Sequence, residues 1–310
     1  MAAPGEVVRR MEPQQLEARV VETWDFDDPV GSRAAFEAAV ETAGSETPEG
    51  MVLRTQVART HSLQRHFEDA DAILDGVQTS FDTQTTAIPE AAAHHVRARI
   101  AIERGRTRNS GGSPGAARPM FETAYDEATA AGLTALAVDA LHMSAIAVSA
   151  TDGPDVAAAV TTRAIAEAEA SDDPATRRWL GPLLNNHGWD LHDAGDYEGA
   201  LKVFRRAVEV RTEFGTPREL AIAKWAVGRC LRSLGRYVEA LEIQEALADS
   251  DDAAEDGYVY EEIGENLLAL DRGTEAVPYF SQAHDLLSED DWLVDNESER
   301  LERLLTLSDE

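Results

Sequence analysis

The sequence has very little cysteine and lysine. One of its 310 residues is cysteine, Cys230, which excludes an intramolecular disulfide and a cysteine-based zinc site and is typical of an intracellular chain. Lys202 and Lys224 are the only lysines, and 28 basic residues face 58 acidic ones, a formal net charge of −30. A surface this acidic repels phosphate backbones and anionic lipids, so we expect neither nucleic-acid nor membrane-surface binding.

A long apolar run is also missing. The longest apolar stretch, residues 133–150, contains Asp139 and His142, and we expect it to be too short and too polar to span a bilayer. Residues 1–11 contain no apolar core of a signal peptide. The expectation is therefore a cytoplasmic protein.

Common catalytic motifs are absent. The sequence contains no Gly-x-Ser-x-Gly, no phosphate-binding loop of the Gly-x4-Gly-Lys-Ser/Thr type and no His-Glu-x2-His. Residues 111–115 are glycine-rich, but no lysine follows them, so we interpret them as a turn. Acidic pairs occur throughout the chain and therefore do not single out an acid/base site. We expect neither an enzyme nor a bound cofactor.

The eight histidines suggest a metal site, but their spacing argues against one. His61 and His66, like His187 and His192, are five residues apart, which on a helix separates them by about 140° around the axis. The adjacent histidines at 94–95 diverge similarly. We therefore predict no shared metal ion and a structural role for the histidines.

Two explanations of the acidic composition stay open. One is adaptation to molar intracellular salt, where the Debye length falls to about 3 Å and a dense carboxylate surface keeps a protein hydrated. The other is a GC-rich genome that favours arginine and alanine codons. Salt adaptation accounts more directly for the net charge.

A spacing pattern recurs along the chain. Its clearest copy consists of Gly188, Leu191, Gly195, Tyr197, Ala200, Phe204 and Ala207. Further copies begin at Gly228 and Gly264, and weaker ones begin at Ala58, Gly105 and Ala145. Six units are thus placed, separated by 36 to 47 residues. A fixed period of this kind is the sequence signature of a repeat architecture.

The pattern resembles the tetratricopeptide repeat (TPR). The resemblance implies an all-α fold, a right-handed α-solenoid of about six helix pairs with terminal capping helices. Small residues recur where two helices approach closely, the Gly-x-Tyr makes the turn, and the phenylalanine or leucine is expected to fill the gap to the next unit. Prolines at 114, 154, 174 and 217 are placed to begin helices, and residues 216–219 have the spacing of a capping box.

Three segments follow from this pattern. Residues 1–48 are expected to form an N-terminal tail and capping helices, at 16–24 and 33–43. Residues 49–290 are expected to form the TPR-like solenoid. Residues 291–310 are expected to form a C-terminal capping helix, because a solenoid must cover the apolar faces of its end units.

The resemblance also indicates a candidate binding surface. In this family the first helix of each unit lines the concave surface, and residues at helical spacing around the small residue share one face. The predicted groove residues on that face are Arg59, Arg106, Asn109, His142, Asn185, Trp189, His192, Trp225, Arg229 and Arg232. Four of them are arginines in a chain with twice as many acids as bases, and only Glu261 and Glu265 of the last unit reverse the sign.

The expected function is a scaffold or adaptor that binds a protein or peptide in the concave groove. Arginine, asparagine and indole groups suit an extended peptide, including one with acidic groups or a free carboxylate. Alternatively, the arginines pair with acids of neighbouring helices and the two tryptophans pack structurally. A self-assembling subunit, forming a homo-oligomer, and a sensor domain for a small acidic ligand or signalling peptide are alternative functions.

Overall fold

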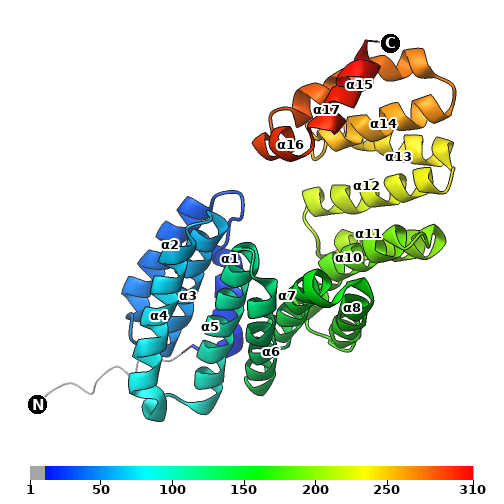
Figure 1. The fold of residues 1–310 in the computed structure, drawn as a ribbon. Helices are drawn as coiled ribbons and strands as arrows, with labels where there is room; N and C mark the ends of the chain where they lie inside the picture. The colour runs from blue at the N-terminus through cyan, green and yellow to red at the C-terminus, as the bar shows by residue number, and fades with distance from the viewer. Residues whose placement is uncertain (1–10, 310) are drawn as a thin grey trace, which may run out of the picture. The chain divides into compact units, whose positions relative to one another are not determined.

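The computed structural model describes residues 11–309 (Figure 1). Helices account for 82% of these residues and no strand occurs among them, which confirms the all-α prediction. The chain forms two compact units that divide between Thr176 and Arg177. The division falls at α9 (Pro174–Arg177), a single helical turn inside the segment 49–290. The tail expected at the N-terminus lies, for residues 1–10, outside the described residues.

The first unit begins with two helices and continues with three helix pairs. Its helices are α1 (Pro13–Thr23), α2 (Pro29–Ala43), α3 (Pro48–Leu63), α4 (Phe67–Gln84), the short η1 (Thr85–Ala87), α5 (Glu90–Ser110), α6 (Pro114–Ala130), α7 (Thr134–Asp152) and α8 (Pro154–Glu169). The pairs are α3/α4, α5/α6 and α7/α8, and the helices of each pair pack against each other. The three pairs coincide with the first three predicted repeats.

The second unit contains three more pairs and ends with two short helices. Its helices are α10 (Leu180–Asp193), α11 (Tyr197–Phe214), α12 (Pro217–Ser233), α13 (Tyr237–Ala248), α14 (Gly257–Ala269), α15 (Gly273–Leu287), α16 (Asp291–Asn296) and α17 (Ser298–Ser308). Within this unit each helix from α10 to α14 packs against the next one along the chain (Figure 1).

A residue with left-handed backbone makes the turn inside every pair. These residues are Arg65 (φ 62°), Gly112 (81°), Gly153 (92°), Gly195 (82°), Gly235 (72°) and Asp271 (59°). Glycine adopts this conformation without steric cost, so it occupies four of the six positions. The repeat spacing placed the third turn at Asp152, but α7 runs one residue further and the turn is at Gly153.

In three of the pairs a phenylalanine ring of the second helix lies directly against the glycine of the first helix and leaves no room for a side chain there. A Cβ added to Gly188 would lie 2.4 Å from the ring of Phe204, and one added to Gly105 would lie 2.4 Å from Phe121. Real side chains do not approach this closely, so glycine sets the distance between the two helices. The phenylalanine therefore packs against the glycine of its own pair, not only toward the next pair as the sequence suggested.

Prolines and polar caps define where many helices begin. Pro114, Pro154 and Pro217 each occupy the first turn of a helix, where a missing N–H costs nothing. The capping box is confirmed: Glu219 N–H donates to Thr216 Oγ1 (3.2 Å), and Thr216 N–H donates to the Glu219 carboxylate (2.8 Å).

Extra helices cover the pairs at both ends of the chain. Leu16 and Val20 of α1 are buried in a cluster with Phe36 of α2 and Met51 of α3. At the other end α17 packs on α15 and buries Leu304. The C-terminal cap consists of two helices, α16 and α17, where the sequence suggested one.

Helix α7 corrects one expectation. It is the one helix of residues 11–309 that is long and apolar enough to cross a bilayer by length and composition, although the sequence stretch had seemed too short and too polar. More than half of it is buried, and it packs between α6 and α8. These are the properties of a core helix.

Candidate functional site

The predicted groove residues lie on the first helices of the pairs. In the first unit Arg59 lies on α3, Arg106 and Asn109 on α5, and His142 on α7. In the second unit the residues on α10 are Asn185, Trp189 and His192, and those on α12 are Trp225, Arg229 and Arg232. The two groups are described separately because they belong to different compact units.

Arg106 is held by internal ion pairs. Its Nη2 donates to both carboxylate oxygens of Asp139 on α7 (2.6 and 2.7 Å), and its Nη1 donates to Glu103 (2.8 Å). The residue is only 8% exposed. The ion pair with Asp139 joins α5 to α7. Separating the two helices would leave a buried charge without its partner, which is costly, so the pair holds α5 against α7.

Arg59 lies between aromatic rings and an acid. Its guanidinium is 5.5 Å from the ring of Trp24, 5.4 Å from that of Phe26, and 3.6 Å from the Glu103 carboxylate. Burial and the nearby charge of Arg106 lower the pKa of Arg59 to about 10. The cation–π contacts compensate part of the lost hydration.

Of the two other predicted residues of the first unit, His142 lies near Asp139 and Arg106. Burial lowers the pKa of His142, and Asp139 opposes the shift. Asn109 is half-buried near the end of α5. Whether these four residues contact a ligand stays a prediction.

The same cluster extends to residues that the sequence analysis missed. Arg99 Nε donates to Glu17 of α1 (2.8 Å), and His95 Nε2 lies 2.5 Å from the same carboxylate. Burial alone would raise the pKa of Glu17, but Arg99 and His95 outweigh burial and lower it to about 2. Glu17 is 78 and 82 residues from its partners, so no local spacing signals the contact.

An aromatic ladder lies across α10, α12 and α14 in the second unit and ends on the first residue of α11. We define it as Tyr197, His192, Trp189, Trp225 and Tyr258, whose successive ring centroids are 4.9, 5.2, 5.9 and 6.2 Å apart. All five residues are half-buried, so each leaves part of its surface in solvent. Three were predicted as site residues, and the tyrosines at the two ends were missed.

Hydrogen bonds and packing fix the indoles. Trp225 Nε1 donates to the Tyr258 carbonyl (3.2 Å), and Trp189 packs edge-on against Phe204 with centroids 4.9 Å apart. These two contacts hold the indole rings of Trp225 and Trp189 in place.

Two arginines beside the ladder share one carboxylate. Arg232 pairs with Glu262 of α14 through two hydrogen bonds (2.7 and 2.9 Å). Arg229 Nε lies 3.2 Å from the same Glu262, and its Nη1 donates to Ser233 (2.7 Å). Burial and the adjacent Arg232 charge lower the pKa of Arg229. One acid thus faces two guanidinium groups, with Glu265 3.8 Å from Arg232 as a weaker partner.

The remaining residues of this face complete the surroundings. His192 Nε2 lies 2.9 Å from Ser233 Oγ, and burial lowers the pKa of that histidine. Asn185 is half-buried on α10. Glu261 and Glu265, which reversed the sign in the sequence pattern, pair with Arg300 and Arg303 of α17.

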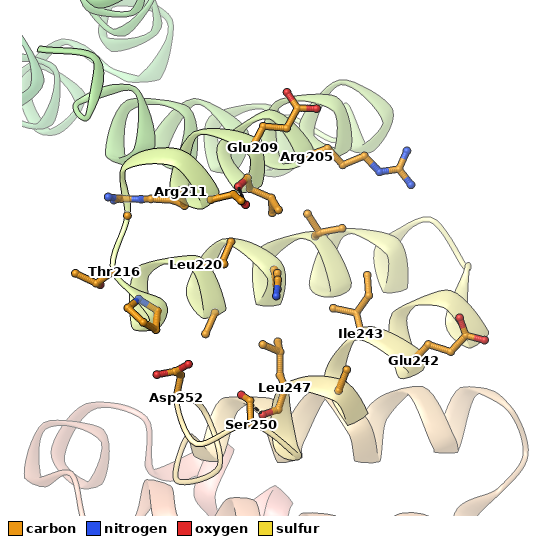
Figure 2. Close-up of a pocket in the computed structure, with 18 residues that line it drawn as sticks. Arg205, Glu209, Arg211, Thr216, Leu220, Glu242, Ile243, Leu247, Ser250 and Asp252 are labelled. Atoms are coloured by element: carbon orange, nitrogen blue, oxygen red, sulfur yellow. Dashed lines mark hydrogen bonds between the residues drawn. The ribbon is translucent and has the colours of Figure 1, made fainter. Parts of the chain in front are cut away.

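A separate groove opens on the other side of α12 (Figure 2). It has a volume of about 860 Å³ and lies between α11 and α13, with Leu220 of α12 in its floor and Ile243 and Leu247 in one wall. Figure 2 shows Arg205 and Glu242 toward one end of this groove and Asp252 toward the other. The sequence analysis did not identify it, because its lining comes from three helices.

One group of metal-ligating side chains lies close together in the first pair. Among residues 11–309, His61, His66 and Asp69 each offer a ligand atom within 4.8 Å of the others. The prediction that His61 and His66 diverge was wrong, because the two residues do not lie on one continuous helix.

Comparisons with known proteins agree with this architecture. Residues 179–251 match a family model described as the tetratricopeptide repeat. No curated protein matches the chain.

Solved structures share the fold at low sequence identity. The apo form of RapI aligns with a TM-score of 0.64 and 12% identity, over 90% of this chain and 76% of that one. A tetratricopeptide repeat protein from Parabacteroides merdae aligns with a TM-score of 0.51 and 15% identity, over 96% and 99%. The APC/C hetero-tetramer Cut9-Hcn1 aligns with a TM-score of 0.65 and 14% identity, over 96% and 50%. The family match in the fourth and fifth helix pairs and the fold shared with these structures confirm the resemblance of this chain to tetratricopeptide repeat proteins.

Proposed function

We propose that the chain is a cytoplasmic binding scaffold that holds a protein or peptide segment on the aromatic ladder. The observation that carries the proposal is the ladder itself, five half-buried rings in one unit, of which four lie on the first helices α10, α12 and α14 and the fifth, Tyr197, begins α11. Tryptophan, tyrosine and arginine are the side chains most enriched among residues that dominate binding energy at protein interfaces. The fold supports a binding role rather than catalysis.

The charges beside the ladder favour a segment that carries a carboxylate. Arg229 and Arg232 share Glu262, so an incoming carboxylate can pair with Arg229 without displacing the two hydrogen bonds between Arg232 and Glu262. The side chain of Arg229 is 28% exposed, whereas that of Glu262 is 5% exposed. A partner therefore reaches the arginine before it reaches the acid.

The test compares an arginine beside the ladder, Arg229 of α12, with an arginine beside the groove of Figure 2, Arg205 of α11. The full chain serves as bait in extracts of its native cells, and the main co-purified protein is then titrated with each variant. We expect Arg229→Ala to weaken binding by about 2 kcal/mol, roughly 30-fold, as interface anchors do. Arg205→Ala, an exposed change on the rim of the groove of Figure 2, should leave the affinity unchanged.

The variants distinguish the possible outcomes. If Arg229→Ala binds the partner with wild-type affinity, the ladder is not the binding site. If only Arg205→Ala loses affinity, the partner binds in the groove of Figure 2 instead. Circular dichroism must show that Arg229→Ala remains folded. Sedimentation at rising concentration tests the alternative of self-assembly, and one tight stoichiometric site for a small acidic ligand would favour the sensor alternative.

A further inference from the structure

The turn of the first helix pair brings two histidines and an aspartate together. His61 lies in the last turn of α3, His66 is the residue that precedes α4, and Asp69 lies in the first turn of α4. His61 Nδ1 is 3.8 Å from Asp69 Oδ2, and the two imidazole centroids are 6.2 Å apart. One ligand atom of each residue lies within 4.8 Å of the others.

The backbone explains why helical phase fails here. Helix α3 ends at Leu63, and Arg65 adopts a left-handed conformation with φ 62°. The His66 N–H then donates back to the His61 carbonyl (2.9 Å), which closes the end of the helix. The chain reverses over the last turn of α3, so two imidazoles that would diverge on one helix approach each other.

The donor set suits a transition metal. Imidazole nitrogen and carboxylate oxygen are ligands that Zn²⁺ binds at about 2.0–2.2 Å, so tetrahedral ligand atoms lie roughly 3.3 Å apart. The distance of 3.8 Å between His61 and Asp69 is about half an ångström longer than this. His66 and Asp69 are exposed and can make that adjustment.

The state of His61 fits a ligand. Its Nδ1, the atom that faces Asp69, is buried and has no hydrogen-bond partner among the described residues. A buried polar atom without such a partner is costly unless another group satisfies it.

We propose that His61, His66 and Asp69 form a binding site for one divalent transition-metal ion of the Zn²⁺ class. The ion joins the end of α3 to the start of α4 and leaves a coordination position for water. It stabilises a turn whose left-handed residue, Arg65, is not glycine and therefore has a steric cost that the four glycine turns lack. The site is independent of the aromatic ladder, which lies in the second unit.

The experiment uses the full chain after treatment with a chelator and dialysis. Zn²⁺ binding is followed by calorimetry, and Co²⁺ is used as a visible probe of imidazole coordination. We expect one equivalent of Zn²⁺ to bind and to raise the melting temperature. His66→Ala and Asp69→Asn, both at exposed positions, should each weaken binding at least tenfold while the circular dichroism spectrum stays unchanged.

His187→Ala is the matched control. His187 and His192 have the same spacing of five residues but lie on one continuous helix, α10. The control should bind Zn²⁺ like the wild type. Equal affinity of the wild type, His66→Ala and Asp69→Asn would show binding by scattered carboxylates and would overturn the proposal, as would the absence of stoichiometric binding by the wild type.

Discussion

At the scale of the residue, one missing side chain determines how close two helices lie. Gly105 of α5 faces the ring of Phe121 in α6, and Gly188 and Gly264 face Phe204 and Phe280 in the same way. In the fifth pair the residue opposite Gly228 is the buried Gln244, whose amide donates to the Trp225 carbonyl (3.3 Å). In these four pairs the contact tolerates different partners but requires the glycine, whereas the first and third pairs have Ala58 and Ala145 at this position.

We predict that Gly105→Ala destabilises the chain although alanine favours helices. The new Cβ would lie 2.4 Å from the Phe121 ring, and forced overpacking costs about 1–3 kcal/mol. The gain in helix propensity, about 1 kcal/mol, equals only the lower end of this cost. Chemical denaturation should show a net loss of up to about 2 kcal/mol.

Gly115→Ala in α6 of the same pair is the control. Its Cβ would meet nothing nearer than Thr151, at 3.9 Å. This variant should be as stable as the wild type or slightly more stable. Equal stability of the two variants would contradict the role assigned to the small residue.

At the scale of the element, ion pairs attach α1 to the repeats. Glu17 of α1 contacts His95 and Arg99 of α5, while Leu16 and Val20 are buried in the apolar cluster beside it. Arg99 and His95 lower the pKa of Glu17 from 4.5 to about 2 despite its burial. A depressed folded-state pKa means that the pair stabilises the chain above about pH 4.5, and that this stabilisation is lost as the pH falls toward 2.

We predict that Glu17→Gln lowers stability at pH 7 and flattens its pH dependence. Neutralising one member of a buried pair costs on the order of 3 kcal/mol. Between about pH 4.5 and pH 2 the variant should lose less stability than the wild type, because it has no carboxylate to protonate at this position. Thermal melts at pH 7 and pH 3 measure both effects.

Glu22→Gln, at an exposed position of the same helix, should retain the pH dependence of the wild type. An identical loss of stability at low pH for Glu17→Gln and the wild type would mean that Glu17 does not couple α1 to α5.

The helices and turns of the repeats could largely be predicted from the sequence. Fixed spacing predicted all six helix pairs, because the small residue, the turn and the buried ring are local features of each pair. The repeat spacing predicted the third turn at Asp152, one residue before its actual position at Gly153. The spacing alone does not show where α7 ends, whereas the glycine does.

The candidate site was less predictable. Trp189 and Trp225 could be placed on first helices from the repeat, but their approach to Tyr258 depends on how α12 and α14 pack. Glu262 and Asp139 could not be identified as arginine partners, since each lies 30 or more residues away in the sequence. His61 and His66 were misjudged because helical phase does not continue through a left-handed turn.

At the scale of the whole molecule, the net charge of −30 is the main electrostatic feature. Many of the arginines are engaged in pairs such as Arg106–Asp139 and Arg232–Glu262, which leaves an excess of acids over the chain. Excess charge of one sign destabilises a compact state by self-repulsion, and salt screens it.

We predict that the melting temperature rises with KCl. Between about 0.05 M and about 2 M the Debye length falls from more than about 10 Å to less than about 3 Å, so repulsion among the exposed carboxylates is removed. Calorimetric scans across this range measure the effect. A constant melting temperature would favour codon bias as the origin of the composition, whereas a large rise would favour adaptation to salt.

The contact between Gly105 and Phe121 has a consequence for how such a chain can change in evolution. Because both residues belong to one pair, a duplicated or deleted pair takes its shape-determining contact with it. The ion pair between Arg106 and Asp139 instead joins one pair to the next. A transplanted pair would therefore keep its own geometry but meet an unmatched charge at its new border. Pairs are interchangeable as shapes, and the order in which they follow one another is restricted by the acids and bases at their borders.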